Sequence, residues 1–268
     1  MPYFACVLNL LSTLSKLNPI LLHQVDGAEL MSRLDQKFLI RSSWIPDLLL
    51  ECQEDYKILE VEGERITTYL NQFIENDAMD ALEEHIRGRK IRSKARIRKY
   101  ESNKKRFIEI KQKTVKGKTI KYRLERAMDA AWNAPLNEVE QTFLSDHFPY
   151  AGARLTELQC EYDRLTLVSN EREERITIDT RIQFHLGKVT HGLGNLAIME
   201  VKQLKIDRFS PMLVALKKFR FSTPPLGRQI RLSKFVVGTL LLNPNLPART
   251  YRATLMQIDK LRNDTTVE

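Results

Sequence analysis

Residues 90–126 read KIRSKARIRKYESNKKRFIEIKQKTVKGKTIKYRLER, and three runs within this stretch alternate between charged and aliphatic side chains. Successive side chains of a β-strand point to opposite faces of the sheet, so an alternating run predicts a strand with two unlike faces. The runs at 90–100, 106–114 and 119–126 predict three consecutive strands, with a turn at Lys116-Gly117 between the last two. One face collects Arg92, Lys94, Arg96, Arg98, Glu109, Lys111, Lys113, Lys121 and Arg123.

Cations on neighbouring strands repel one another by roughly 0.2–1 kcal/mol for each directly opposed pair. A fold that gathers so many of them needs a counter-charge, and a polyanion is the natural one. The alternative is a solvated outer face. The opposite face, with Ala95, Ile97, Ile108 and Ile110, is continuous and aliphatic, so it can serve as the packed side.

The composition bounds the class of protein. The 268 residues are 43% hydrophobic, enough to bury a full core in one domain or two small ones. The net charge of +9 favours an anionic partner: nucleic acid, an anionic membrane or a phosphorylated small molecule. Cys6, Cys52 and Cys160 lack the spacing of a disulfide framework or a zinc site and fit a reducing compartment.

Membrane and secretion signals are missing from the sequence pattern. Its apolar runs fall short of the roughly 18–20 residues that a membrane-spanning helix needs. The N-terminus lacks the basic region and cleavage site of a signal peptide. We therefore expect a cytoplasmic protein.

The rest of the chain predicts further strands joined by short turns, with helices between them. Strands are expected at 32–41, 155–169, 172–185 and 196–204, and a hairpin of 56–61 with 65–70 around Glu62-Gly63. A helix within 3–24 should end near Asn18-Pro19, Ser43 should cap a helix with Pro46 in its first turn, and Asn76 or Asp77 should open another. Further helices are expected at 135–148, 210–219 and 249–262, and an apolar segment at 232–242.

These elements predict an α+β fold with an antiparallel sheet, because no strand–helix–strand regularity is present. The strands with one charged and one aliphatic face are all satisfied if the sheet closes into an eight-stranded β-barrel, apolar outside beneath helices and polar within. Lysines and arginines would then point into a shared, water-accessible tunnel. A phosphate chain or a nucleotide is small and anionic enough to enter it. A single domain over 1–268 follows, with a core at about 30–242 flanked by helices at 3–24 and 249–262.

Seven motifs in register resemble a known family over roughly residues 30–242. The resemblance is to the VTC domain, the catalytic module of the vacuolar transporter chaperone polyphosphate polymerase, in a bacterial stand-alone form. The wider group is the triphosphate tunnel metalloenzymes. The motifs are Ser32-Arg33-x-Asp35-x-Lys37-Phe38, Lys94-x-Arg96-x-Arg98-x-Tyr100, Glu109-x-Lys111, Lys121-x-Arg123, Arg175-Ile176-Thr177-x-Asp179-Thr180, Glu200-x-Lys202 and Ser233-Lys234-Phe235-x-x-Gly238.

The resemblance implies an eight-stranded tunnel that transfers the γ-phosphate of ATP to a growing polyphosphate chain, with Mn²⁺ or Mg²⁺. Catalytic phosphate contacts are then implied for Lys37, Arg96, Arg98, Lys111, Lys121, Arg164 and Lys234. Substrate-binding positions are implied for Arg33, Lys94, Arg123, Tyr162, Arg175, Arg231 and Ser233. Metal-binding carboxylates are implied for Glu200, Asp35 and Glu109.

Two departures from the family pattern bear on function. Arg231 stands where the polymerase pattern prefers lysine, which keeps the charge but changes a point donor into a planar fork. Asp35 stands alone where hydrolase-type relatives carry a pair of glutamates, which weakens a hydrolase interpretation. Phosphoryl transfer to a terminal phosphate oxygen needs positioning and charge neutralisation rather than a general base. The lack of a Ser-His-Asp set is therefore no objection.

Several alternatives stay open at this stage. Glu200 could pair with Lys202, Asp35 with Arg33, Tyr162 could belong to the core, and His85 is expected to be exposed or to cap a helix. The protein could be a hydrolase of tripolyphosphate or an organic triphosphate, or a non-catalytic sensor of polyphosphate or nucleotide. Nucleic acid is not expected, since the cationic faces have few interleaved aromatics. Export of product across a membrane would need a membrane-protein partner.

Overall fold

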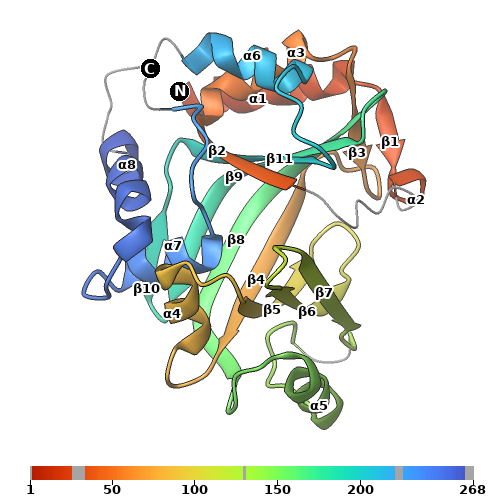
Figure 1. Ribbon diagram of the computed structural model, residues 1–268. Coiled ribbons are helices and arrows are strands. Elements are labelled where there is room, and N and C mark those ends of the chain that lie inside the picture. Colours follow the sequence, from red (N-terminus) through yellow and green to blue (C-terminus); the bar gives the residue numbers. More distant parts are fainter. Residues whose placement is uncertain (1, 26–33, 129–130, 221–225, 263–268) are drawn as a thin grey trace.

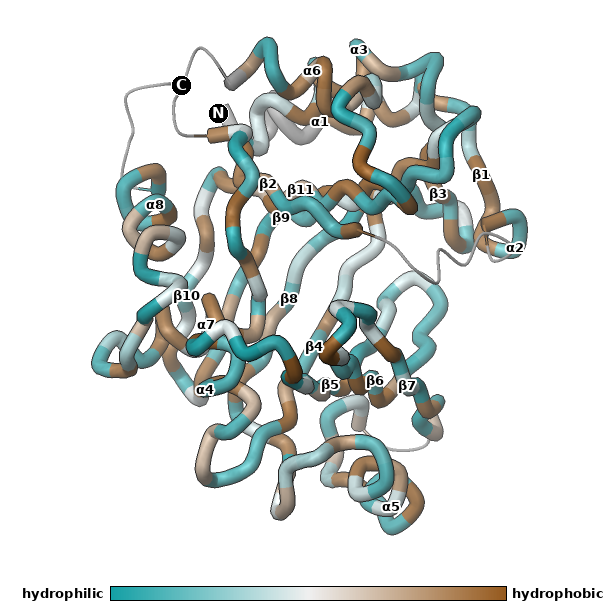
Figure 2. Tube along the Cα trace, in the orientation of Figure 1, coloured by the Kyte–Doolittle hydropathy of each residue, from teal (hydrophilic) through white to brown (hydrophobic). Residues whose placement is uncertain are grey.

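The computed structural model describes residues 2–25, 34–128, 131–220 and 226–262 (Figure 1). Its main feature is an antiparallel path of eight strands, and hydrophobic and hydrophilic residues alternate along several of them, such as β8 and β9 (Figure 2). The order is β2 (Leu34–Arg41), β11 (Leu196–Gln203), β9 (Glu174–Leu186), β8 (Arg154–Ser169), β4 (Thr67–Glu75), β5 (Arg92–Tyr100), β6 (Arg106–Lys113) and β7 (Thr119–Glu125).

The α+β class and the antiparallel sheet are confirmed, but closure into a barrel is not. Within the described residues, the path ends at β2 on one side and β7 on the other, and no hydrogen-bonded ladder joins these two strands. The sheet is strongly curved instead, so that all eight strands of the path contribute side chains to one concave face. Three short strands extend it: β1 (Pro19–Leu21), β3 (Tyr56–Glu60) and β10 (Val189–Gly192).

One layer of helices covers the outer face of β2, β11, β9 and β8 (Figure 1). Helix α1 (Pro2–Lys16) contributes Leu14 and Leu17 to this core, and α3 (Ile45–Glu51) contributes Leu48 and Leu49. Helix α6 (Pro211–Arg220) adds Met212. The strand residues beneath them recur at every second position along β8, β9 and β11 and include one residue of β2: Leu165, Leu167, Ile176, Ile178, Met199, Val201 and Ile40.

The second core forms around α7 (Lys234–Leu242), which packs against β8, β9 and β10. Phe235 packs on Phe73 of β4 with ring centroids 5.1 Å apart. Part of the concave face is therefore apolar and covered by a helix, where the sequence predicts a uniformly polar interior. Around this core lie α4 (Asp80–Arg87), α8 (Arg252–Arg262) and, against β6 and β7, α5 (Glu138–His147).

Several local predictions need correction. Helix α1 ends at Lys16, close to the predicted end near Asn18-Pro19, but residues 19–25, which the predicted flanking helix at 3–24 includes up to residue 24, form β1 and α2 (Leu22–Val25). Ser43 lies in a short 3₁₀ turn and does not cap α3, although Pro46 is in its first turn as predicted. The predicted turn at Glu62-Gly63 is present, with Val61 and Glu64 hydrogen-bonded across it, but the predicted pairing of 56–61 with 65–70 goes no further, because β3 and β4 both pair with the long strand β8.

Helix α7 is held in place by close packing at Gly238. A Cβ atom at this position would overlap the ring of Phe184 on β9. Because α7 begins at Ser233-Lys234, this contact also fixes the position of two predicted site residues.

We predict that Gly238→Ala destabilises the protein by about 1–3 kcal/mol, the usual cost of overpacking a core. Thermal denaturation of wild type, Gly238→Ala, Phe184→Leu and the double variant measures it. The double variant should be more stable than the sum of the single effects predicts, because the smaller side chain leaves room for the methyl group. Additive effects would contradict the proposed contact.

Candidate active site

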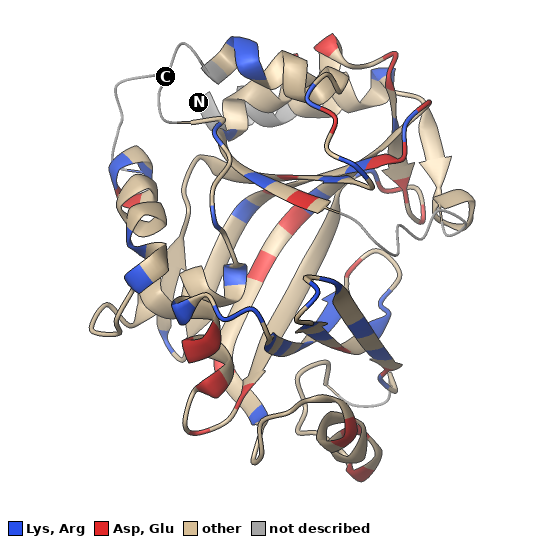
Figure 3. Ribbon diagram, viewed as in Figure 1, with Lys and Arg blue, Asp and Glu red and all other residues tan. Residues whose placement is uncertain are grey.

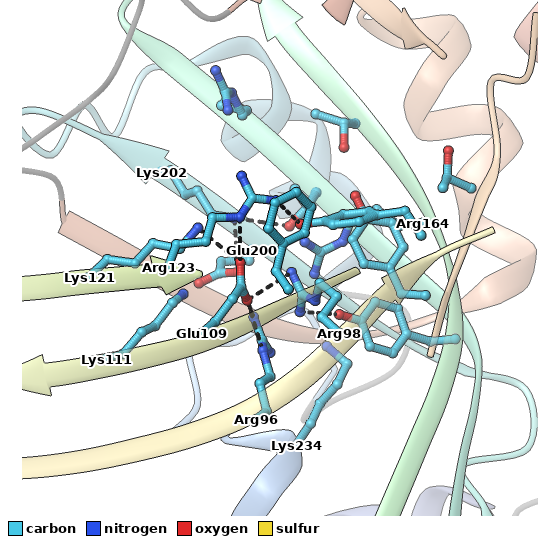
Figure 4. A pocket seen from close by; sticks show the side chains of 18 of the residues that line it. Arg96, Arg98, Glu109, Lys111, Lys121, Arg123, Arg164, Glu200, Lys202 and Lys234 are labelled. Atoms are coloured by element: carbon cyan, nitrogen blue, oxygen red, sulfur yellow. Dashed lines mark hydrogen bonds and ion pairs between the residues drawn. The ribbon is translucent and has the colours of Figure 1, made fainter. Parts of the chain in front are cut away.

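The concave face of the sheet holds a cavity of about 450 Å³ (Figure 4). Side chains from all eight strands of the path line it, together with the N-terminus of α7. The lining side chains that carry positive charge are Lys37, Arg65, Lys94, Arg96, Arg98, Lys105, Lys111, Lys121, Arg123, Arg164, Arg175, Lys202 and Lys234. The lining carboxylates are Asp35, Glu109 and Glu200.

The cavity accounts for the basic character of the whole chain. Among the described residues, thirteen lysines and arginines and three carboxylates line it. Taking these from the totals of 43 and 34 leaves 30 basic and 31 acidic residues elsewhere. The excess of positive charge is therefore an internal feature, and Figure 3 shows basic residues concentrated on β5, β6 and β7. A field of this sign in a concave site attracts anions.

Glu109 on β6 lies at the centre of one group of cations (Figure 4). Arg96 donates to its Oε2 from Nε at 3.0 Å and from Nη2 at 2.7 Å, and Arg98 Nη1 lies 3.7 Å from the same oxygen. Its Oε1 lies 2.9 Å from Lys121 Nζ and 3.8 Å from Arg123 Nε. Burial alone would raise the pKa of this carboxyl, but the charges of Arg98 and Arg96 outweigh it and hold the pKa well below its usual range.

Asp179 on β9 is the carboxylate shared by a second group of cations, Arg164 and Lys234. Arg164 donates two hydrogen bonds to Asp179, from Nε to Oδ1 at 2.5 Å and from Nη2 to Oδ2 at 2.7 Å. Lys234 of α7 also donates to Oδ2. Asp179 is buried, and its pKa is lowered because Arg164 and Lys234 outweigh the effect of burial. The sequence assigns Asp179 to one face of its strand with Arg175 but gives it no role.

Glu200 on β11 has two lysine partners. Its Oε2 accepts from Lys202 Nζ at 2.8 Å, and its Oε1 lies 3.8 Å from Lys37 Nζ on the neighbouring strand β2. Burial would raise the pKa of Glu200, but the two lysines hold it well below its usual range. Lys202 also donates to Thr177. The pairing with Lys202, which the sequence leaves open, is therefore present, and Lys202 is a cavity residue that the sequence-based set omits.

Lys94 and Lys111 differ from the other cations, because neither has a hydrogen-bond or ion-pair partner among the described residues. They are direct cross-strand partners on β5 and β6, and both line the cavity. The pKa of Lys111 is lowered to about 7, chiefly by burial and next by the positive charge of Arg96. The pKa of Lys94 falls well below its usual value because of burial and the charges of Lys37 and Lys111. An anion between them would supply the missing counter-charge.

Ser233, like Lys94 and Lys111, has a side chain whose hydrogen-bonding capacity is unused among the described residues. It is the residue before α7, is 5% exposed, and lines the cavity, yet its Oγ has no hydrogen-bond partner among the described residues. It does not cap its own helix. The first N–H groups of a helix have no intrahelical acceptor and carry partial positive charge, so a hydroxyl beside them favours an anionic ligand.

Aromatic side chains line part of the wall beside the cations. Tyr69 stacks on Tyr162 at 5.3 Å between ring centroids and contacts Tyr100 edge-on at 4.9 Å. The guanidinium of Arg98 lies over Tyr69 and donates to the hydroxyl of Tyr162 at 2.9 Å. Tyr162 is buried in the core and also lines the cavity, so both alternatives that the sequence leaves open apply to it.

Of the seventeen residues predicted for the site, fifteen line this one cavity. Arg33 lies outside the described residues. Arg231 does not line the cavity: its side chain is exposed, and its guanidinium lies against Gly88 at the end of α4. The expectation of an exposed or capping His85 is wrong, because its side chain is buried and burial lowers its pKa to about 3.

The residue set can contribute to a metal site but does not form one alone. Among the described residues, no group of three or more histidine, cysteine, aspartate or glutamate side chains comes together. Both oxygens of Glu109 face cations, and so do both oxygens of Glu200, where the longer contact is the 3.8 Å from Lys37 Nζ to Oε1. Mg²⁺ is commonly held by one or two carboxylates together with the phosphates of a substrate. The lining carboxylates Asp35, Glu109 and Glu200 are of the kind that could hold such a metal together with a substrate.

A family model for the VTC domain matches residues 32–243. The chain belongs to the VTC domain family. The match covers all eight strands of the path, α7 and every residue predicted for the site. None of the curated proteins matches the chain, and no helix within the described residues is long and apolar enough to cross a bilayer.

Solved structures also resemble this VTC domain at low sequence identity. A candidate adenylate cyclase from Vibrio parahaemolyticus is 14% identical with a TM-score of 0.46, over 77% of this chain and 97% of that one. One from Bacillus halodurans is 14% identical with a TM-score of 0.44, over 75% and 94%. A candidate adenylyl cyclase from Hippeastrum, described as having a dominant triphosphatase activity, is 14% identical with a TM-score of 0.42, over 80% and 98%.

The lowered pKa of Lys111 leads to a pH dependence of stability. A lysine in the unfolded chain has a pKa of about 10.4, so between about pH 7 and pH 10 the unfolded state binds more protons than the folded one. The stability of the ligand-free protein should therefore gain a contribution from Lys111 as pH rises through this window. Phosphate binding should weaken over the same window, because it needs the charged lysine.

Lys111→Met should remove this pH dependence together with the cost of the buried charge, and raise Tm by about 2–4 °C near pH 6, the shift that roughly 1 kcal/mol gives in a chain of this size. Denaturant unfolding across the pH range measures the difference, with exposed Lys57→Met as the control. If wild type and Lys111→Met show the same slope against pH, Lys111 stays charged in the folded protein and the interpretation is wrong.

Proposed function

We propose that this VTC domain is a metal-dependent phosphotransferase that moves the γ-phosphate of ATP onto a polyphosphate chain. The observation that carries the proposal is the charge imbalance of the cavity, where thirteen lining cations meet three lining carboxylates. ATP and polyphosphate carry several negative charges within a few bonds. Few other cellular ligands combine such charge density with a size that fits about 450 Å³.

The reaction needs little covalent help from the protein. A terminal oxygen of the polyphosphate chain forms a bond to the γ-phosphorus of ATP, while the bond from that phosphorus to the β,γ-bridging oxygen breaks and ADP leaves. The attacking oxygen is already anionic, so no proton has to be removed. The protein's task is to hold both anions in line and to neutralise charge that shifts onto the bridging oxygen.

The fixed cations are suited to that task. Arg96, Arg98 and Arg164 are each locked by a buried carboxylate or a tyrosine hydroxyl, so their charges are preorganised before a ligand arrives. Lys94 and Lys111, which lack partners, are the groups that gain most from a bound phosphate. We assign phosphate contacts to Lys37, Arg96, Arg98, Lys111, Lys121, Arg164 and Lys234, with Lys94, Arg123, Arg175 and Ser233 in supporting contacts.

The cavity also offers surface for the nucleoside part of ATP. Leu22, Leu59 and Val61 line it together with the aromatic rings of Tyr69 and Tyr100. Inorganic tripolyphosphate has no apolar or aromatic part that could pack on such groups, whereas a base and a ribose can pack on them. This favours ATP as the donor.

A divalent metal, held by Glu200 with Asp35 as the second candidate, would neutralise phosphate charge and orient the γ-phosphate when bound. Mn²⁺ and Mg²⁺ both suit oxygen ligands. Asp35 lies on β2, where it is the register partner of Lys202, two residues from the Lys37–Glu200 pair. We place Glu109 outside the metal site and assign it to the arginines that it binds.

A hydrolase would use the same cavity but needs an activated water. Glu109, Asp179 and Glu200, with pKa values held below their usual range by arginines and lysines, are poor general bases. Of the described carboxylates that line the cavity, Asp35 is then left to activate a water, and this scarcity favours the transferase. A sensor without turnover is the remaining alternative.

The three alternatives separate by their products. Purified protein with ATP and Mn²⁺ should yield ADP and long phosphate polymers, resolved on a gel. Orthophosphate released from tripolyphosphate would instead identify a hydrolase. Binding of ATP or polyphosphate without turnover would identify a sensor.

Lys234→Ala and Arg96→Ala should each lower turnover by about 10²–10³-fold, the usual loss when one preorganised charge donor is removed. Polymer synthesis is the readout, and circular dichroism checks that the fold is kept. Lys57→Ala, an exposed residue of β3, removes the same charge outside the cavity and should leave turnover unchanged. Full activity in either Lys234→Ala or Arg96→Ala would disprove the site assignment.

Glu200→Gln keeps the shape of the side chain but removes its charge, so it should weaken the metal dependence. A titration of activity against Mn²⁺ should show a higher metal concentration for half-maximal activity, or no activity at all. The matched control is Glu161→Gln on β8, which does not line the cavity. An unchanged metal titration in Glu200→Gln would exclude this carboxylate as a ligand.

A further inference from the structure

The row of cations on β5 and β6 does not stop at the edge of the cavity. Arg92 and Lys113 are direct cross-strand partners, two residues beyond the partners Lys94 and Lys111 on the same strands. Residues two apart on a strand share a face and lie about 7 Å from each other. Arg92 and Lys113 therefore continue the line of Lys94 and Lys111, although neither lines the cavity itself.

Arg231 joins this pair from the segment before α7. Its guanidinium packs so closely on Gly88 that a Cβ atom there would lie 2.9 Å from its Nη1. Gly88 has a φ of +71° at the end of α4, so glycine is needed there both for the turn and for the arginine. The charges of Arg92 and Arg231 both act on Lys113 and, with burial as the larger cause, lower its pKa.

These three residues form a group that we call the outer basic cluster: Arg92, Lys113 and Arg231. Among the described residues, no carboxylate pairs with any of them, and the hydrogen bond found is from Arg92 Nη1 to the carbonyl oxygen of Arg89. Two other groups of cations on this sheet share a buried carboxylate, Glu109 or Asp179, whereas Lys94 and Lys111 do not. Like charges without a shared anion repel, so the cluster is a place where an external anion would be stabilised.

We infer that the outer basic cluster binds the part of a polyphosphate chain that extends beyond the cavity, and so makes the protein prefer chains longer than tripolyphosphate. The inference rests on the proposed function, because it extends the same line of phosphate contacts. It gives Arg231, which stands outside the cavity, a role with long chains only. It also adds two residues, Arg92 and Lys113, that the family motifs do not include.

The chemistry favours polyphosphate over single-stranded nucleic acid at this cluster. Stacking on aromatic rings is a main source of affinity for single strands. Tyr251, which lies close enough for the charges of Arg231 and Arg92 to act on it, is 4% exposed and cannot present a face to a base. Polyphosphate carries a negative charge on every unit and has no bases, so it can bind a row of cations that offers no aromatic stacking surface.

The test compares ligands of two lengths on matched variants. Calorimetric titration of tripolyphosphate and of a long polyphosphate of defined length gives two dissociation constants for each protein. Wild type should bind the long chain more tightly. Arg92→Gln/Lys113→Gln should lose roughly tenfold in affinity for the long chain, with little change for tripolyphosphate. The control Lys57→Gln/Lys188→Gln removes two charges at exposed positions away from the cluster and should keep the wild-type preference.

The two readouts separate the inference from the proposed function. If wild type binds neither ligand, the proposed function fails and the inference with it. If tripolyphosphate binds normally but the double variant keeps the full preference for long chains, the inference alone is overturned. The inference would also be overturned if the double variant lost affinity equally for tripolyphosphate and for the long chain. The same holds if, in a parallel titration, it lost as much affinity for an oligothymidylate as for the long polyphosphate. The single variants Arg92→Gln and Lys113→Gln, each expected to lose part of the preference, serve if the double variant does not fold.

Discussion

Glu109 is the group on which the cationic cavity depends. Its buried carboxylate meets two arginines of β5 at Oε2, and a lysine and an arginine of β7 at Oε1. Three adjacent strands can therefore place their charges on one face without separating. Removing one partner of a buried ion pair commonly costs 3–5 kcal/mol, because the other charge stays buried without compensation. Here one anion compensates several cations at once, so its loss would affect the whole β5–β7 part of the sheet.

Asp179 compensates the charges of Arg164 on β8 and Lys234 on α7, as Glu109 compensates the cations of β5 and β7. The two carboxylates fix the cations that have to be in place before a ligand binds. Lys94 and Lys111 line the same cavity and have no anion of their own among the described residues. The ligand-free protein thus carries a cost that a bound phosphate relieves, and binding should stabilise the fold by mass action. The same lack of compensation that weakens the empty protein supplies affinity for an anion.

The period-two pattern of the sequence predicts which residues share the concave face but not how the strands close. Alternation on β5, β6 and β7 depends only on local geometry, and the predicted cations of these strands line the cavity except for Arg92 and Lys113 at one end. Pairing depends on contacts far apart in the chain, and nothing local reveals that β3 and β4 both lie along β8. Residues 232–242 read only as apolar, because a buried helix and a buried strand have the same composition. Arg231 fits a family motif, yet a glycine of another helix decides where its side chain lies.

The position of α7 explains why an open sheet suffices for a cavity. A closed barrel of eight strands would leave one continuous bore, whereas here a helix packs into part of the concave face. The packing of Phe235 on Phe73 closes the apolar part, and both rings also line the cavity, so they form a border between core and polar site. The same helix brings Ser233 and Lys234 to that border at its N-terminus, where its unpaired N–H groups add positive potential. One element therefore completes the core, limits the cavity and contributes to its charge, which makes ladder closure between β2 and β7 unnecessary for holding an anion.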